Sequence, residues 1–516
     1  MYRGARHRVY HRAMAKGDFS SLKIDNFGRG INLVDPLEEM DTGYLGPSTT
    51  NVLPIGKGNS LENADGAFVT QTFVNSTTRR PNELIKYLNG LIVSNLDGSV
   101  DRLAQTNGVV TSIGVVDGAG PPAVVVSQDS ALSQYYAYII RSPATSLNNT
   151  KVNLSTAASV TWPGSPPSGV CGISWKTMMV IGAKSRIRFS TQGNPDSWPA
   201  NNFIDIKTLD DASDDIVGFE ILGEDLIVFK KRSTWMVFDP ITFDNRRLFS
   251  VGLVSRKAVS RLDDRIFWIG TDSIYSTDGS TLKNEAVKLG LNGNTSTFAL
   301  WLGGAGGLPN TDCSLTCSPD GRVVASDASL CSFVGYSNNR DFNGDMPWYK
   351  LSGVQGFLPI DTVWNNQNFG SSDIYSDSEN NRFLGIILQS TNNQFLAPIL
   401  DSGVASQFLS SSIAVQAVIE LPTFHNPSVE DISRLRRLNL YGHGTFGNTG
   451  VAAIEVYNDN GGSLAYTTPA GAFSGEFIRV RPETRAKNFV VRIRSDGLVP
   501  TFQLHSVEAQ FRKGGR

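Results

Sequence analysis

Pairs of short apolar strands that return at a regular spacing limit what this chain can fold into. In the clearest pair, residues 226–229 and 234–238 are largely apolar and are separated by a polar turn at 230–233. The turns of three such pairs fall near residues 183, 231 and 271, which is a period of roughly 40 to 50 residues. This period is typical of the four-stranded blades of a β-propeller, whereas a β-sandwich shows turns about every 8 to 12 residues without a longer repeat.

The other pairs have the same pattern. Their strands are 91–94 with 100–103, 178–181 with 186–189, 265–269 with 274–275, and the weaker 323–324 with 330–333. These strands are apolar at consecutive positions, as expected where neighbouring blades cover both faces of a strand. Residues 135–140 supply a strand for a further blade in the gap between two of the pairs. We therefore expect an all-β chain with a propeller over residues 76–400, of six blades within a range of five to seven.

The two ends of the chain differ from this middle part. Residues 1–75 begin with a basic segment and continue with scattered Gly, Asn, Pro and Asp without periodicity, so we expect a basic N-terminus and an extended arm. The basic segment is either a frayed terminus or a contact for a phosphate or an acidic partner; its basic residues are Arg3, Arg6, Arg8, Arg12 and Lys16. Residues 401–516 contain six longer alternating runs between Gly and Asn turns, which predicts a separate C-terminal β-sandwich.

Composition supports this interpretation and narrows the classes of partner. Charged residues make up 18% of the chain, where about 25% is usual, while 50 glycines and 23 prolines indicate many turns. Lys and Arg (46) nearly balance Asp and Glu (48), so no global field favours nucleic acid or anionic membranes. Neither a membrane-spanning apolar segment nor the apolar core of a signal peptide is evident, and we expect folding in the cytosol.

The sequence offers little that could carry out catalysis. Its five histidines show no pair at metal-ligand spacing, and the Gly-x-Ser-x-Gly, phosphate-loop and dinucleotide motifs do not occur. One carboxylate cluster either binds Ca²⁺ or forms a turn between two strands, and the missing EF-hand glycine and glutamate favour the turn; it comprises Asp205, Asp210, Asp211, Asp214 and Asp215. Four cysteines are too few for a disulfide framework, and we interpret them as reduced thiols; they are Cys171, Cys313, Cys317 and Cys331. We therefore expect no catalytic residue, cofactor or metal.

Several residues are better explained as structural anchors of the blades. Gly193 and Pro195 shape a turn after an alternating strand, and Trp198 is large enough to fill the space between blade layers. The full set that we expect to be blade anchors is Ser190, Gly193, Pro195, Trp198, Trp235 and Trp268.

The order of these segments is similar to that in a known family. Residues 186–190 followed by 193–198 resemble a strand-turn segment of the tail nozzle proteins of short-tailed bacteriophages, also called tail tubular protein B or packaged-DNA stabilisation proteins. The resemblance continues in order through 215–233 and 252–279, and the arm segment 28–32 with 51–53 is similar to that family's N-terminal arm. The close match covers about 170–280.

This resemblance implies a structural protein of the virion tail, made in the cytoplasm of the bacterial host. Such proteins form a homohexameric tube below the portal and the adaptor, retain packaged DNA, and provide its channel during ejection. The implied partners are further copies of the chain, the phage adaptor (head-to-tail connector), tail fibre or tailspike proteins, and double-stranded DNA that passes without specific contacts. Two alternatives stay open, namely a carbohydrate- or receptor-binding propeller of a virion and a propeller that hydrolyses glycans.

Overall fold

The structure is a computed structural model of the 516-residue chain. It describes residues 19–35, 37, 39–41, 43–55, 60–63, 71–72, 81–87, 90–104, 110–114, 116, 118–129, 134–207, 214–240, 242, 244–290, 313–327, 331–341, 343–352, 371–377, 382–390, 393–399, 417–425, 432–443, 453–458, 463–468, 477–495 and 503–513.

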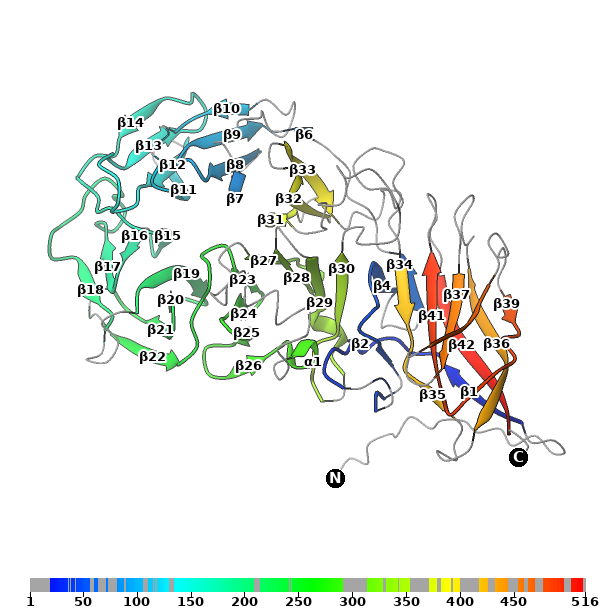
Figure 1. Cartoon of the computed structure of the whole chain (residues 1–516). Coiled ribbons are helices and arrows are strands. Elements are labelled where there is room, and N and C mark those ends of the chain that lie inside the picture. The colour runs from blue at the N-terminus through cyan, green and yellow to red at the C-terminus, as the bar shows by residue number, and fades with distance from the viewer. Residues whose placement is uncertain are drawn as a thin grey trace.

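Two β-structures lie side by side, a ring of small sheets and a pair of larger stacked sheets (Figure 1). Within the described ranges, helix is confined to α1 (Val287–Gly290) and the 3-10 helix η1 (Ser337–Asn339). The protein is therefore all-β, as the sequence predicts. No helix among the described residues is long and apolar enough to cross a membrane.

Over the described residues, the ring consists of seven four-stranded antiparallel sheets, the blades of a β-propeller. Blades 1 to 3 are β7 (Pro81–Tyr87), β8 (Gly90–Asn95), β9 (Val100–Ala104), β10 (Val110–Ser112); β11 (Ala123–Asp129), β12 (Gln134–Ile140), β13 (Thr150–Asn153), β14 (Ser159–Thr161); and β15 (Cys171–Trp175), β16 (Met178–Ala183), β17 (Arg186–Phe189), β18 (Phe203–Asp205). Blades 4 to 6 are β19 (Ile216–Leu222), β20 (Asp225–Lys230), β21 (Thr234–Val237), β22 (Asn245–Phe249); β23 (Val259–Leu262), β24 (Arg265–Ile269), β25 (Ile274–Thr277), β26 (Leu282–Asn284); and β27 (Cys313–Cys317), β28 (Arg322–Asp327), β29 (Cys331–Tyr336), β30 (Trp348–Ser352). Blade 7 is β31 (Ser371–Asp377), β32 (Arg382–Ser390), β33 (Asn393–Ile399) and β6 (Gln71–Thr72).

The ring is closed in two ways. The first strand of each blade contacts the first strand of the next blade from β7 round to β31, and β31 in turn contacts β7. The outer strand of blade 7 is β6, which precedes blade 1 in the chain and pairs with β33. Strand pairing therefore joins the two ends of the propeller. The expected count of six blades is corrected to seven, the upper end of the predicted range, because residues 371–399 form a blade with this distant strand.

The apolar strand pairs found in the sequence are the second and third strands of their blades. In blade 4, Leu226 and Phe229 of β20 have no exposed surface, and neither does Val237 of β21. Both faces of such a strand are buried because a neighbouring blade covers each of them. This explains why these strands, and not the outer ones, stand out in the sequence.

The second body is a β-sandwich of a seven-stranded and a five-stranded sheet. The seven-stranded sheet contains β1 (Phe19–Ile24), β4 (Val52–Ile55), β5 (Ser60–Asn63), β36 (Ser433–His443), β39 (Phe477–Val480), β40 (Thr484–Ala486) and β42 (Gln503–Lys513). The five-stranded sheet contains β34 (Ala417–Glu420), β35 (Phe424–His425), β37 (Ala453–Asn458), β38 (Ser463–Thr467) and β41 (Asn488–Ser495). The sheets meet across an apolar core, in which the rings of Phe489 and Phe511 lie 5.8 Å apart.

The extended N-terminal arm lies against both bodies of its own chain. Its strand β1 pairs with β42, from Phe19 opposite Arg512 to Ile24 opposite Val507. The described residues between 26 and 51, including the parallel pair β2 (Gly30–Ile31) and β3 (Tyr44–Leu45), lie between blades 5 and 6 and the sandwich (Figure 1). The arm thus contributes strands to the sandwich and, through β6, to the propeller. Its basic residues before Phe19 lie outside the described residues.

A continuous apolar core joins the two bodies. One cluster of buried side chains includes Trp268 of blade 5, Trp348 of blade 6, Phe27 and Leu45 of the arm, and Phe489 of the sandwich. The arm therefore fills the space between the bodies with packed side chains.

Candidate functional site

Two buried carboxylates flank the arm where it joins the propeller to the sandwich. We call this region the arm seam: residues 26–51 together with Glu285 on the propeller side and Glu420 on the sandwich side. Both carboxylates belong to residues with 3% exposed surface or less. A buried carboxylate needs a cation and hydrogen-bond donors, and each of the two has them.

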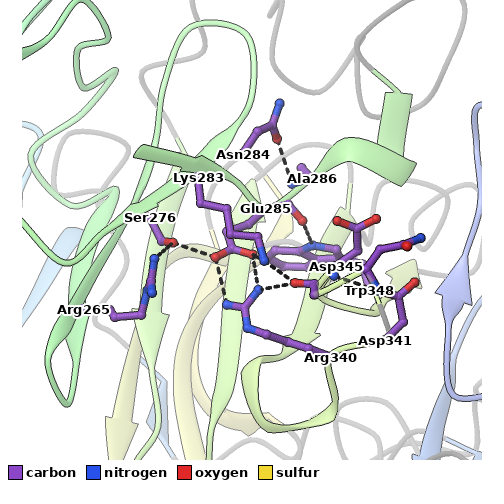
Figure 2. A network of polar contacts seen from close by, with 12 residues as sticks. Arg265, Ser276, Lys283, Asn284, Glu285, Ala286, Arg340, Asp341, Asp345 and Trp348 are labelled. Carbon is purple, nitrogen blue, oxygen red and sulfur yellow. Dashed lines mark hydrogen bonds and ion pairs between the residues drawn. The ribbon is translucent and has the colours of Figure 1, made fainter. Parts of the chain in front are cut away.

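Glu285 directly follows β26 and joins blade 5 to blade 6 (Figure 2). Its two oxygens accept hydrogen bonds from the two terminal nitrogens of Arg340, at 2.6 and 2.8 Å. The hydroxyl of Ser276 in β25 donates a third bond at 2.6 Å. A bidentate guanidinium pair of this kind is among the strongest hydrogen-bonded pairs in proteins. Glu285 therefore holds blades 5 and 6 together through a hydrogen-bonded ion pair.

The same network continues into the arm. The indole N–H of Trp348 donates to the backbone oxygen of Glu285 at 2.7 Å, and Asp341 lies 3.5 Å from a terminal nitrogen of Arg29. Gly30 has a φ of +74° and packs directly on the backbone of Trp348, where a Cβ would approach the carbonyl oxygen to 2.5 Å. Only glycine satisfies both conditions at position 30.

Glu420 fastens the other side of the arm. Its carboxylate accepts a hydrogen bond from Arg492 Nε at 2.6 Å and from the backbone N–H of Ser48 at 2.9 Å. Its backbone oxygen accepts the N–H of Gly46 at 2.8 Å, and a Cβ at Gly46 would lie 2.5 Å from the carboxylate. Burial alone would lower the pKa of Arg492, but the neighbouring carboxylate raises it. The guanidinium thus stays charged.

A third contact joins the arm to α1. Asp35 accepts hydrogen bonds from the side-chain amide of Asn32 at 2.7 Å and from Lys288 Nζ at 2.9 Å. These two donors, Asn32 first, hold the pKa of Asp35 below its usual value. The backbone N–H of Leu33 also donates to the carbonyl of Lys288 at 2.8 Å. The arm therefore binds the propeller through both side chains and backbone.

A second cationic centre lies in the propeller itself. Arg256, in the loop between blades 4 and 5, forms an ion pair with Glu83 of blade 1 at 2.7 Å. The same guanidinium donates to the carbonyls of Val170, Pro121 and Pro122 at 2.8 to 3.1 Å. These residues belong to blade 1 and to the loops before blades 2 and 3, so one side chain connects separated parts of the ring.

The expected blade anchors occupy different kinds of position. Trp268 has no exposed surface and donates its indole N–H to Gly252 at 3.2 Å. Trp235 is also buried and donates to the hydroxyl of Ser233 at 3.0 Å. Ser190 is buried and its hydroxyl oxygen accepts the backbone N–H of Met179 at 2.9 Å. All three side chains are therefore buried and hydrogen-bonded within the propeller.

The turn at 193–198 corrects one expectation. Gly193 has a φ of +72°, as a turn requires, but Trp198 is only half-buried. The fully buried aromatic is its neighbour Trp162, whose ring meets that of Trp198 edge to face at 5.5 Å. The carbonyl of Pro195 accepts the indole N–H groups of both tryptophans, at 3.0 Å from Trp162 and 2.9 Å from Trp198. Trp162 is the anchor of this corner, and Trp198 covers it.

The described members of the carboxylate cluster each bind a different neighbouring side chain. Asp205 forms a two-point ion pair with Arg186, which lowers the pKa of Asp205. Asp214 is buried and accepts from the hydroxyl of Ser233 at 2.6 Å. Asp215 lies 2.8 Å from Lys231. Asp210 and Asp211 lie outside the described residues.

The remaining side chains that could bind a metal or react are the cysteines and the carboxylates of the blades. Across the described part of the chain, no three His, Cys, Asp or Glu side chains are grouped as a metal site. Cys171 and Cys317 are buried free thiols, and burial raises the pKa of each to about 12. A hollow of about 530 Å³ between blades 4 and 5 has Asp278 in its wall. Hydrogen bonds from Thr281 and Ser280 hold the pKa of Asp278 well below its usual value.

Comparisons with known proteins find a distant structural resemblance. No family model matches the chain, and no curated protein matches it. Among solved structures, the crystal structure of BamB from Moraxella catarrhalis resembles it with 11% sequence identity and a TM-score of 0.37, over 67% of this chain and 96% of that chain. The assignment to the β-propeller class rests on the strand pairing and ring closure described above.

Proposed function

We propose that this chain is a structural, non-enzymatic protein of a virus tail, of the kind that forms the nozzle of short-tailed bacteriophages. In this role it forms a tube below the portal and the adaptor, retains packaged DNA, and provides its path during ejection. The observation that carries the proposal is the place of the resembling segments. Residues 170–280 span blades 3 and 4 and the first three strands of blade 5, so the resemblance follows consecutive blades in their order.

The arm seam supports a mechanical role. A continuous apolar core, together with the bonds of the arm to Glu420 of the sandwich and to Lys288 of the propeller, holds the two bodies together. A part of a tail tube must keep its shape when DNA passes under pressure, and a packed interface resists motion better than a flexible linker. The buried carboxylates of Glu285 and Glu420 each form an ion pair with an arginine, which favours a structural role over a hydrolytic one.

The proposed assembly is a homohexameric ring that contacts the adaptor on one side and fibres or tailspikes on its flank. Because β1, β4 and β5 of the arm pair within their own chain, the ring contact that we propose uses outer surfaces of the sandwich and the propeller. Closure needs two different complementary surfaces on each copy.

The test is a virus that lacks this chain. We expect particles that fill with DNA but do not retain it, and that regain stable DNA content when the wild-type chain is supplied. Particles that keep their DNA and fail only to attach to host cells would overturn the nozzle proposal in favour of a receptor-binding propeller.

A further inference from the structure

The outer face of the seven-stranded sheet is unusually rich in arginine. On the inner side, Leu435 and Leu440 of β36 and Phe511 of β42 are buried in the sandwich core. Because successive side chains of a strand point to opposite faces, Arg434 of β36 and Arg512 of β42 lie on the outer side. We call this outer surface the arginine face; its arginines in strands are Arg434, Arg437, Arg479, Arg485 and Arg512.

Strand register places like charges directly opposite one another. Arg434 lies opposite Arg485 of β40 on one side and opposite Arg512 of β42 on the other. Three guanidinium groups therefore share one row across three strands, an arrangement that lowers the stability of a sheet. One carboxylate, Glu483, serves two of the neighbouring arginines, at 2.8 Å from Arg434 and 3.5 Å from Arg436. The fold itself does not require such a row, so it calls for another explanation.

The charge of this region differs sharply from that of the whole chain. Residues 433–443, 477–487 and 503–512 contain eight basic residues and two acidic ones, a net charge of +6, while the whole chain has −2. The basic residues are Arg434, Arg436, Arg437, Arg479, Arg481, Arg485, Lys487 and Arg512, and the acidic ones are Glu483 and Glu508.

Three of these arginines are exposed and lie outside the ion pairs of the described residues. Arg437, Arg481 and Arg485 are exposed, and among the described residues none of their side chains takes part in an ion pair. A β-bulge between Leu435 and Arg437 places consecutive arginines at the surface of β36.

We infer that the arginine face binds the phosphate backbone of double-stranded DNA without reading its sequence. Guanidinium groups bind phosphates through paired hydrogen bonds, and a row of them neutralises several phosphates at once. Four strands spaced about 4.8 Å apart, β40, β36, β42 and β1, give a surface roughly 14 Å wide. Duplex DNA carries about one phosphate charge per 1.7 Å of its axis, so a surface of this width can meet several phosphates at once.

The rest of the face favours nucleic acid over a protein partner. A stable protein interface needs an apolar centre, whereas a DNA interface is polar and positive. Between the arginines, register places Ser21, Lys23, Asn439, Glu508 and Gln510 on this side, while Phe19 and Phe477 occupy positions at its two ends. Tyr441 directs its hydroxyl to Glu508 at 3.2 Å. The middle of the face is therefore polar and carries no apolar centre, and the two phenylalanine positions stand at its ends.

The biological role of this face rests on the proposed function, in which DNA passes through a tube made of this protein. The contact is expected to be weak, because few phosphates can meet one sheet face and salt competes with them. Weak contacts without sequence preference allow a duplex to slide.

The experiment measures binding of the full chain to a fluorescein-labelled 20-base-pair duplex of arbitrary sequence, by anisotropy between about 25 and 200 mM salt. The test variant carries Arg437→Gln, Arg481→Gln and Arg485→Gln, which removes three exposed charges without breaking an ion pair. The matched control carries Lys184→Gln, Lys207→Gln and Arg232→Gln, three exposed charges of blades 3 and 4 and their loops.

We expect the wild-type chain and the control to bind alike, and the test variant to bind at least about tenfold more weakly at the lowest salt. The slope of log affinity against log salt should fall by about 3, roughly one for each lost phosphate contact. Absence of binding by the wild-type chain at 25 mM salt, or equal losses in both variants, would overturn the inference. Binding to polyglutamate but not to DNA would also overturn it, in favour of an acidic protein partner.

This result is separable from the proposed function. A chain that binds DNA through the arginine face but is absent from virus tails contradicts only the nozzle proposal. A chain that forms the nozzle while both triple variants bind DNA equally contradicts only the inference about this face.

Discussion

Single aromatic residues set much of the stability of the blades. Trp268 is fully buried, and its ring lies 5.3 Å from that of Phe229 and 5.8 Å from that of Tyr275. Trp268→Ala should therefore lower the free energy of unfolding by about 3 to 5 kcal/mol. Trp198→Ala should cost less, because half-buried Trp198 has less surface to lose from the core. Urea unfolding followed by circular dichroism measures both, and an equal or reversed order would contradict this account.

Buried thiols make the free energy of unfolding decrease at alkaline pH. Burial raises the pKa of Cys171 to about 12, while an unfolded thiol ionises near pH 9. Above pH 9 the unfolded state loses its proton and the folded state keeps it, so the free energy of unfolding falls as the pH rises toward 12. The stability of the wild-type chain relative to Cys171→Ala should shrink by about 2 kcal/mol between pH 8 and pH 10.5. A difference that stays constant over this range would contradict the burial of this thiol.

The sequence pattern predicts the burial of some of these residues and not of others. Trp235 and Trp268 lie in strongly apolar strands, so their burial follows from the pattern. The burial of Trp162 does not follow from strand periodicity, because Trp162 stands beside Pro163 in a segment without such a pattern. A tryptophan between turn residues is nevertheless itself a signal of a buried corner. The pairing of Glu285 with Arg340 joins residues 55 positions apart, which no local pattern shows.

At the scale of elements, the arm depends on glycines that allow close approach. Gly30 and Gly193 both have positive φ, but only Gly30 would direct a Cβ into neighbouring backbone, and Gly193 faces open space. Gly193→Ala should cost about 1 kcal/mol from backbone strain alone. Gly30→Ala should cost about 2 to 5 kcal/mol, because the strain is joined by the clash with Trp348. Limited proteolysis of the arm and urea unfolding check this pair, and similar losses for both variants would refute the role of the close contact.

The sequence predicts the hairpins well and the long-range strand pairing poorly. A hairpin is visible locally, because two apolar runs and a turn lie within about 15 residues. The pairing of Phe19 with Arg512, or of Thr72 with Phe395, depends on the whole fold. Local patterns do not predict the seventh blade for this reason, since its fourth strand, β6, precedes blade 1 in the chain.

At the scale of the whole molecule, net charge is a poor guide to binding surfaces. The near balance of 46 basic and 48 acidic residues predicted no preference for nucleic acid. The strands of the sandwich nevertheless collect a charge of +6 on three segments, so the remainder of the chain carries −8. At moderate salt, charges interact over only about 10 Å, so a partner responds to the charges of the surface that it contacts and not to the net charge of the chain.

The symmetry of this protein inside an assembled virus particle tests the central proposal most directly. Electron cryo-microscopy of the tail should show six copies around the tail axis below the adaptor, each with a seven-bladed propeller and a sandwich joined through the arm seam. A single copy, or three copies on the flank of the tail as a spike, would contradict the assignment as a tail nozzle.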